Sequence, residues 1–177
     1  MDLVSRNYVR ARAAACNICG EVGALTWDHV PPKGGIELEP VEIDRAAAAY
    51  VSSLASEKPE VSHDGLRFRT ICARCNSLLG ATYDPALNAL ARTVGRFLRT
   101  PLTLPAVVQV ETRPTAVVRA VLGHLLAARL SSEDGFFDPD IRGLVLDPAR
   151  AIPDQIHIHY WLYPYGQQIV VRDALMP

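Results

Sequence analysis

The chain has 177 residues, of which 49% are hydrophobic and 21% charged, as in an ordinary folded protein with one domain or a small domain plus an appendage. The net charge of −1 argues against indiscriminate binding of nucleic acid. No stretch approaches the ~20 consecutive apolar residues of a membrane helix, and arginines interrupt the N-terminal segment where a signal peptide would have its apolar core. We therefore expect a cytoplasmic protein whose four cysteines serve metal binding or catalysis rather than disulfides.

The charge is unevenly distributed along the chain. Residues 67–99 contain six arginines and one acid, whereas residues 36–64 contain seven acids against Arg45 and Lys58. The basic segment could contact phosphate, or it could be an ordinary solvated surface.

In the first third of the chain, the sequence predicts short helices and strands separated by irregular segments. Residues 1–15 are predicted to form a short, poorly capped helix, and residues 16–31 a turn followed by one or two short strands. Two prolines after Val30 then stop any helix. Residues 33–64 are predicted to be irregular apart from a helix over about 44–56, where the composition favours one.

Clearer signals follow in the middle of the chain. Residues 66–71 alternate apolar and polar side chains, which predicts a half-buried strand. A helix is predicted over 72–79. Tyr83-Asp84-Pro85 then supplies a helix N-terminus with proline in the first turn, which predicts a second helix ending near Arg99.

Beyond Thr100-Pro101 the sequence predicts a different set of elements. They are a strand over 106–112, a helix over 114–130, a short helix over 138–146, and a hairpin of two strands, 154–163 and 167–172.

The four cysteines form two matching pairs, Cys16-x-x-Cys19 and Cys72-x-x-Cys75. A gap of two residues lets both thiolates of a pair reach one metal ion at ~2.3 Å, and two pairs complete a tetrahedron. A zinc ion (Zn²⁺) held by four thiolates has no open position, so its role would be structural. The alternative is a set of free or redox-active thiols, but a redox pair does not require a second copy of itself.

Two further polar elements adjoin the cysteine pairs. Asp28 and His29 follow shortly after the first pair, and Asn76 comes directly after the second. If one zinc ion joins the pairs, these side chains converge, and the oxygens of Asp28 and Asn76 suit Mg²⁺ or a similar ion. His29, on the other side of its strand, could deprotonate a water molecule. The alternatives are purely structural roles, a helix N-cap for Asn76 and an ordinary polar contact for His29.

The order CxxC, Asp-His, CxxC-Asn resembles that of the HNH (ββα-metal) endonuclease superfamily in its zinc-stabilised form, over about residues 16–80. The resemblance implies an α+β fold, with a treble-clef ββα-metal core around a structural zinc and a C-terminal α+β extension. It implies hydrolysis of phosphodiester bonds in DNA, with His29 as general base. Asp28 and Asn76 would then hold a catalytic Mg²⁺ or Mn²⁺, and the cysteines the zinc.

The sequence departs from the family pattern in two places. The position of the family's middle Asn falls in residues 61–65, which contain no Asn, so that His63 or Asp64 would have to substitute. Fifty-two residues separate Cys19 from Cys72, which identifies residues 36–64 as an acidic insertion. The expected division is a zinc domain over 1–100 and an extension over 101–177.

Several basic side chains near the expected site are candidates for contact with nucleic acid. They are Lys33, Arg74, Arg92 and Arg96. Arg92 and Arg96 share a helical face with Arg99, and this face could meet either phosphate or solvent. A module that reaches one strand at a time would need a homodimer to cut a duplex fully.

The rival interpretation is a treble-clef zinc module without catalytic activity that binds nucleic acid or protein.

Three histidines lie outside the cysteine frame. His124 is predicted to be a core or interface residue of an apolar helix, and His157 and His159 to share one face of a strand.

Overall fold

The computed structural model describes residues 8–9, 13–34, 41–43, 60–62, 66–103, 106–129 and 134–159. These residues form an α+β fold, as the sequence predicted. The strands form a four-stranded sheet of order β1-β6-β3-β2 and a separate pair β4-β5. Their bounds are β1 Tyr8–Val9, β2 Ala13–Ala15, β3 Val22–His29, β4 Val41–Ile43, β5 Glu60–Ser62 and β6 Arg67–Cys72.

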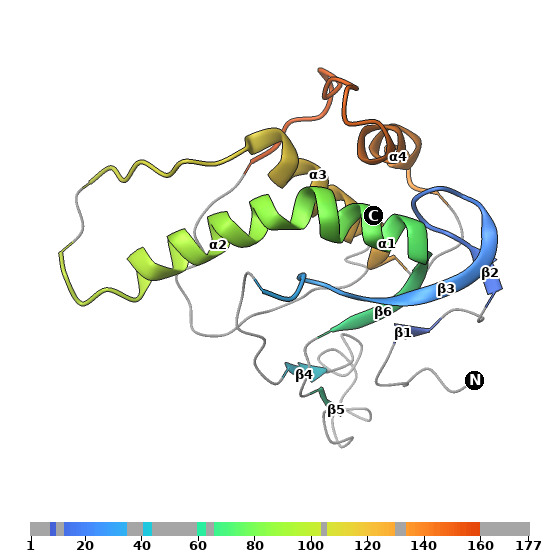
Figure 1. Cartoon of the computed structure of the whole chain (residues 1–177), viewed down its shortest axis with the longest axis horizontal. Coiled ribbons are helices and arrows are strands. Elements are labelled where there is room, and N and C mark those ends of the chain that lie inside the picture. The colour runs from blue at the N-terminus through green and yellow to red at the C-terminus, as the bar shows by residue number, and fades with distance from the viewer. Residues whose placement is uncertain are drawn as a thin grey trace, which may run out of the picture.

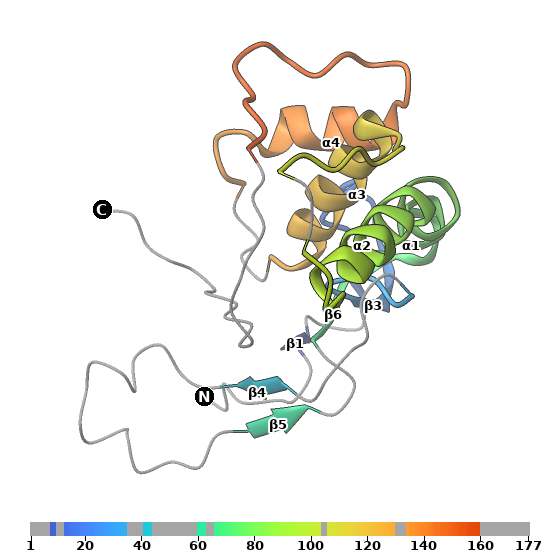
Figure 2. The same ribbon diagram turned by 90° about the vertical axis from the view of Figure 1, so that its left-hand side faces the viewer.

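The helices lie together on one side of strands β3 and β6 (Figures 1 and 2). Helices over 72–79, 84–99, 114–130 and 138–146 were predicted, and each is present with slightly different ends. The helical elements are α1 Ala73–Leu78, η2 Leu79–Tyr83, α2 Asp84–Leu98, α3 Pro114–Ala127 and α4 Asp138–Leu146.

The predicted helix over residues 1–15 is wrong where the structure describes that segment. Tyr8–Val9 is a strand parallel to β6, and Ala13–Ala15 is a strand antiparallel to β3. A helix this short is marginal in water. The edges of β3 and β6 offer backbone hydrogen bonds that outweigh the local helix preference of alanine.

The pairing of β3 with β6 contains one irregularity. It shifts between Thr26 and Asp28, where Trp27 alone lies opposite two residues of β6, so the extra residue belongs to β6. Side chains alternate regularly along this part of β3. Thr26 and Asp28 both face the helices, where Thr26 contacts Asn76 of α1 and Asp28 contacts His124 of α3.

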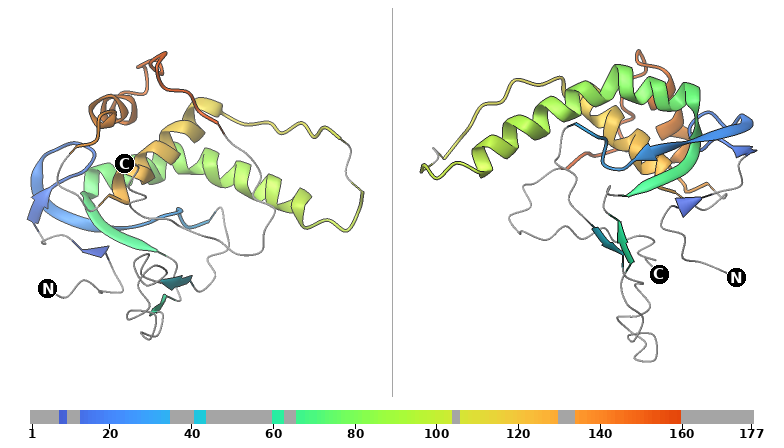
Figure 3. Two further views of the ribbon diagram at one scale, coloured as in Figure 1. Left: turned by 180° about the vertical axis from the view of Figure 1, so that it is seen from behind. Right: turned by 60° about the horizontal axis from the view of Figure 1, so that its bottom comes forward.

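Elements α1, η2 and α2 form one continuous helical rod, drawn in green in Figure 3. The sequence predicted a new N-terminus at Tyr83-Asp84-Pro85, but Tyr83 and Asp84 both have αR backbone angles and no side-chain cap bond is present there. The π-helical turn η2 joins the two helices, and Tyr83 and Asp84 are both buried. Asp84 is therefore available for a tertiary contact instead of a cap.

Two predicted strands after residue 100 are absent where the chain is described. Residues 106–112 and 154–159 contain no strand. Val107 is 76% exposed, and β-favouring residues form a strand only when a partner strand and a face to pack on are present. The rest of the predicted hairpin and the predicted helix over 44–56 lie outside the described residues.

One hydrophobic core joins the cysteine-bearing part to the helices that follow residue 113. Asn17, between the first two cysteines, donates hydrogen bonds of 2.8 Å to the backbone oxygens of Leu126 and Arg129 at the end of α3. These bonds satisfy carbonyl groups that the helix end leaves without partners. The core members from both parts include Ile18, Leu25, Ile71, Leu79, Ala120, Leu126, Leu144 and Val145.

The end of α4 is held by a buried arginine of α3. Arg119 donates to the backbone oxygens of Leu144, Asp147, Pro148 and Arg150. A guanidinium group is well suited to this task because it offers several donors in a fixed plane. None of the described helices has the length and apolar character needed to cross a bilayer.

Candidate metal centre and the polar network beside it

The first cysteine pair lies in a tight turn between β2 and β3. The Gly20 amide donates to the Cys16 oxygen at 2.8 Å, and the Cys16 amide donates to the Glu21 oxygen at 2.9 Å. Gly20 has a φ of 75°, a conformation that glycine adopts without steric cost. The turn therefore brings Cys16 and Cys19 to the same side.

The second pair lies where β6 ends and α1 begins. Cys72 is the last residue of β6 and Cys75 is in the first turn of α1. The Cys72 amide donates to the Cys16 sulfur at 3.3 Å, which ties the two pairs together. A backbone N–H directed at sulfur stabilises the thiolate form that a metal ligand requires.

The four sulfur atoms lie within 4.8 Å of one another. Cys19 Sγ and Cys72 Sγ are 3.8 Å apart, and a tetrahedron with Zn–S bonds of ~2.3 Å has edges of about 3.8 Å. Within the described residues, no other group of three or more Cys, His, Asp or Glu side chains is this close. The quartet can therefore hold a metal ion, and its size and sulfur ligands suit zinc.

Hydrogen bonding among the thiols shifts their pKa values. The bond from Cys75 lowers the pKa of Cys16 to about 4, and the same bond raises the pKa of Cys75. Burial raises the pKa of Cys19. Protons shared in this way would be released when a metal ion binds.

Arg74, a predicted contact for nucleic acid, lies beside the cysteine quartet. Its guanidinium group is 3.1 Å from a carboxylate oxygen of Glu21, and both side chains are exposed. A hydrogen bond with Cys19 raises the pKa of Arg74. An exposed ion pair of this kind contributes little to stability and leaves the arginine accessible.

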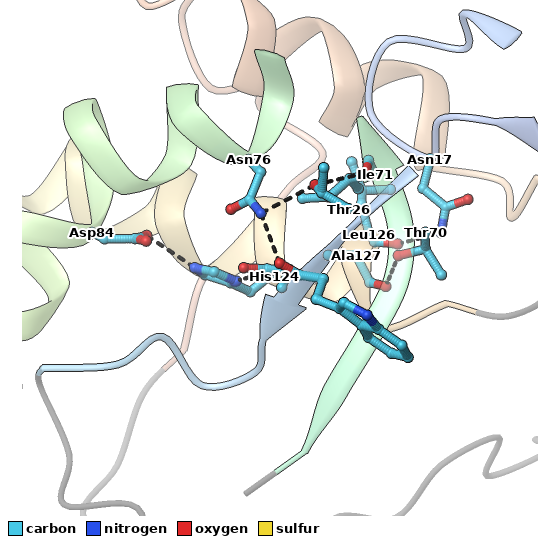
Figure 4. A network of polar contacts seen from close by, with 11 residues as sticks. Asn17, Thr26, Thr70, Ile71, Asn76, Asp84, His124, Leu126 and Ala127 are labelled. Atoms are coloured by element: carbon cyan, nitrogen blue, oxygen red, sulfur yellow. Dashed lines mark hydrogen bonds and ion pairs between the residues drawn. The ribbon is translucent and has the colours of Figure 1, made fainter. Parts of the chain in front are cut away.

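Asn76 reaches from α1 to strand β3, just before the Asp28–His29 pair. Its Nδ2 donates to the Trp27 oxygen at 2.9 Å and to Thr26 Oγ1 at 3.2 Å (Figure 4). The structure therefore brings Asn76 to the strand end that carries Asp28 and His29. Because both of these bonds use the amide nitrogen, Oδ1 is the Asn76 atom that would meet a cation.

Asp28 lies in a buried network that joins three elements. His124 Nδ1 is 2.9 Å from Asp28 Oδ2, and His124 Nε2 is 2.9 Å from Asp84 Oδ1. The imidazole from α3 thus bridges β3 and the start of α2, as Figure 4 shows for its contact with Asp84. The side chains of His124 and Asp28 are 4% and 8% exposed.

Two opposing effects set the pKa of His124. Burial lowers it, but the hydrogen bonds and negative charges of Asp28 and Asp84 outweigh burial and raise it to about 9. His124 is therefore an imidazolium at neutral pH, and each of its N–H groups donates to one carboxylate.

The sequence predicted that His124 lies in the core or at an interface, and His124 is buried, but its acidic partners were not predicted. They are 96 and 40 positions away in the chain. The local feature of the sequence that could have indicated such partners is the position of His124 within an apolar helix. A polar, ionisable side chain is seldom buried unless a partner binds it.

His29 lies on the opposite face of β3 from Asp28. It pairs with Arg67 of β6, and side chains of directly opposed residues in an antiparallel pair share one face. The structure therefore keeps the predicted base adjacent in sequence to Asp28 but directs the two side chains to different sides of the sheet.

The remaining predicted site residues lie along α2 and the segment after β3. Asn88 donates to the Lys33 oxygen at 3.1 Å, and Arg92 donates to the Gly34 oxygen at 2.5 Å, so α2 fixes the backbone beyond the two prolines. The Lys33 and Arg96 side chains are exposed. His63 and Asp64 lie outside the described residues, and His157 and His159 are exposed in a segment without strand structure.

Comparison with models of known protein families, with curated proteins and with solved structures finds no match to this chain.

Proposed function

We propose that this protein is a metal-dependent endonuclease of the HNH type, with a structural zinc in the cysteine quartet. The observation that carries the proposal is the hydrogen bond from Asn76 to the Trp27 oxygen, which joins helix α1, where Cys75 lies, to the strand end bearing Asp28 and His29. This bond supports the proposal because it brings Asn76 to the end of β3, where Asp28 faces the helices and His29 the other side of the strand.

The order of elements supports a treble-clef core. The Cys16–Cys19 turn is followed by β3, which pairs with β6, and β6 leads directly into α1 with the second cysteine pair at the junction. A zinc ion at the quartet would fix the turn, the two strands and the helix at a single point. Its role in this proposal is structural.

The proposed reaction is hydrolysis of a phosphodiester bond in DNA. Asp28 and Asn76 would each contribute an oxygen to hold Mg²⁺ or Mn²⁺, an ion that retains several waters. When bound, such an ion stabilises negative charge on the phosphate and on the leaving oxygen. His29 would accept a proton from the attacking water. Lys33 and Arg74, both exposed, would contact the backbone of the strand.

The alternative function is a zinc module without catalytic activity that binds nucleic acid or protein. The observation that favours it is the hydrogen bond of Asp28 Oδ2 to His124, in a site where both side chains are buried. Asp28 already has a cationic partner in His124. Only its other oxygen, Oδ1, would be left to bind a metal ion.

A supercoiled plasmid incubated with zinc-loaded protein and Mg²⁺ or Mn²⁺ distinguishes the two functions. The endonuclease proposal expects nicked and linear products that depend on the added ion and disappear with His29→Ala. Wild-type protein that binds DNA but leaves duplex, branched and single-stranded substrates intact with every divalent ion tested would overturn it in favour of the zinc module.

A further inference from the structure

Beyond the zinc and the proposed catalytic residues, the outer face of the sheet carries a cluster of one aromatic and two basic side chains. We infer that Trp27, Arg67 and Arg69 form the surface that binds the substrate strand, and that it fits DNA with unpaired bases. This inference rests on the proposed function, because it assigns the class of strand on which His29 would act.

The three side chains lie on the face of the sheet opposite the helices. Phe68 and Thr70 of β6 are buried, and Thr70 donates to the Ala127 oxygen of α3, so these two side chains face the helices. Side chains alternate along a strand, which directs Arg67 and Arg69 to the other face. Figure 2 shows the helices gathered on one side of β3 and β6.

Trp27 lies on this face because its neighbours Thr26 and Asp28 both face the helices and side chains alternate along the strand. The guanidinium carbons of Arg67 and Arg69 are 5.7 and 5.4 Å from the centre of its ring. Both distances are within the range of cation–π attraction. The indole remains 38% exposed, so the ring that positions the two arginines also offers surface to a ligand.

The chemistry of this cluster matches that of a nucleic-acid strand. A guanidinium group over an aromatic ring uses its plane for that contact, and its N–H groups point outward in that plane, the geometry that phosphate oxygens accept from. Because the ring restricts both arginines, less side-chain entropy is lost when phosphate binds. An exposed indole can stack on a base only when that base is unpaired or at an end, which favours single-stranded or distorted DNA.

The cluster is continuous with the proposed catalytic histidine. His29 is paired directly with Arg67 across the two strands, so its side chain lies on the same face. A strand bound along Trp27 and the two arginines would therefore run past His29.

The test is binding of a fluorescein-labelled 20-nucleotide single strand, compared with the same sequence as a duplex, without added divalent ion. We expect the single strand to bind more tightly and to quench tryptophan fluorescence. Trp27→Leu should lower single-strand affinity about tenfold or more and abolish most of the quenching. Arg67→Gln with Arg69→Gln should lower affinity and reduce the salt dependence of log K by about 1.4, the value for two phosphate contacts.

A matched control removes two exposed arginines elsewhere, Arg113→Gln with Arg150→Gln, and should bind like wild type. Zinc content and melting temperature establish that each variant folds, and Trp27→Phe, which keeps a stacking ring, should retain most of the affinity. Equal affinities for wild type, Trp27→Leu and the Arg67/Arg69 variant overturn the inference, as does tighter binding of the duplex.

The outcomes separate this inference from the proposed function. Wild type that binds the single strand through Trp27 but never cuts plasmid retains the inference and rejects the endonuclease. Variants that bind and cut like an active wild type reject the inference and retain the endonuclease.

Discussion

Asp28 and His124 are 96 positions apart in the sequence, yet Oδ2 of the first lies 2.9 Å from Nδ1 of the second. The contact joins the strand that carries the proposed catalytic pair to a helix that lies beyond the predicted boundary near residue 100. Asp84 binds the other nitrogen of the same ring. The part after residue 113 therefore supplies a charged group at the centre of the cysteine-bearing part.

This network predicts that stability falls as pH rises. The pKa of His124 is about 9 in the folded protein, above the ~6.5 of an exposed histidine in the unfolded chain. The stabilisation is complete below pH 6.5 and is lost as pH rises through 9. We expect it to contribute about 3 kcal/mol to the free energy of unfolding, measured by urea unfolding of zinc-loaded protein between pH 6 and 9.5.

His124→Gln tests whether this histidine causes the effect. The variant should be less stable than wild type below pH 6.5 and should lack most of the pH dependence. His159→Gln, at an exposed position, should keep the wild-type profile. A wild type equally stable at pH 6.5 and 9.5 would contradict the prediction.

Loss of one cysteine should remove the metal ion and much of the fold. Cys72→Ser should lower the zinc content from about one per chain to nearly none, because three thiolates no longer complete the tetrahedron. Since metal binding supplies much of the folding free energy of a small zinc module, circular dichroism should show loss of structure.

Ser77→Ala, an exposed change in α1, which follows Cys72, is the control and should retain zinc. Reduced, folded wild-type protein that contains no zinc by elemental analysis would reject the metal assignment.

Gly123 should be required for the packing of α3 against η2. A Cβ atom added there would lie 2.4 Å from Leu79 Cδ2, and Leu79 is fully buried. Overpacking a core costs ~1–3 kcal/mol, which exceeds the ~1 kcal/mol that alanine gains over glycine in a helix. Gly123→Ala should therefore lower the free energy of unfolding.

Gly95→Ala in α2 is the matched control. A Cβ there would meet only the end of the Arg99 side chain, at 3.4 Å, so this change should raise stability by ~0.5–1 kcal/mol. If urea unfolding shows that both substitutions stabilise the protein equally, the tight packing of Gly123 against Leu79 is contradicted.

Removal of the proposed base should abolish most cleavage without affecting the metal centre. His29→Ala should lower the plasmid cleavage rate by about 10²–10⁴-fold, the usual contribution of a general base, with zinc content unchanged. Asn76→Ala should also lower the rate, but through cation affinity, so that excess Mg²⁺ or Mn²⁺ restores part of it.

The same excess of metal ion should leave His29→Ala inactive, because the missing step is removal of a proton. Rescue of both variants by metal ion, or of neither, would contradict the assigned roles.

The acidic insertion should be dispensable for folding. Strands β4 and β5 pair antiparallel, ending at Ile43 opposite Glu60, so a two-residue Asn-Gly turn can replace residues 44–59. We expect zinc content and melting temperature to remain close to those of wild type, while substrate choice or oligomeric state changes. Light scattering and the plasmid assay check the second expectation, and a variant identical to wild type in both would contradict it.

The sequence alone was sufficient to predict the features that depend on residues close together in the chain. The spacing of the four cysteines predicted one cluster because two residues between thiols fix how they can reach a common point. The helices predicted over 84–99, 114–130 and 138–146 each have a proline at or next to the first residue, and each is present with slightly different ends. These features depend on residues a few positions apart.

Only the tertiary structure decided the features that depend on distant partners. Residues 8–9 and 13–15 form strands because β3 and β6 offer open edges, whereas residues 106–112 form none and pair with no strand in the part of the chain that the structure describes. The register of β3 with β6 places Asp28 on the side of His124 and the indole of Trp27 beside Arg67 and Arg69. This register depends on which residues of two distant strands pair, and the order of residues along the chain does not record it.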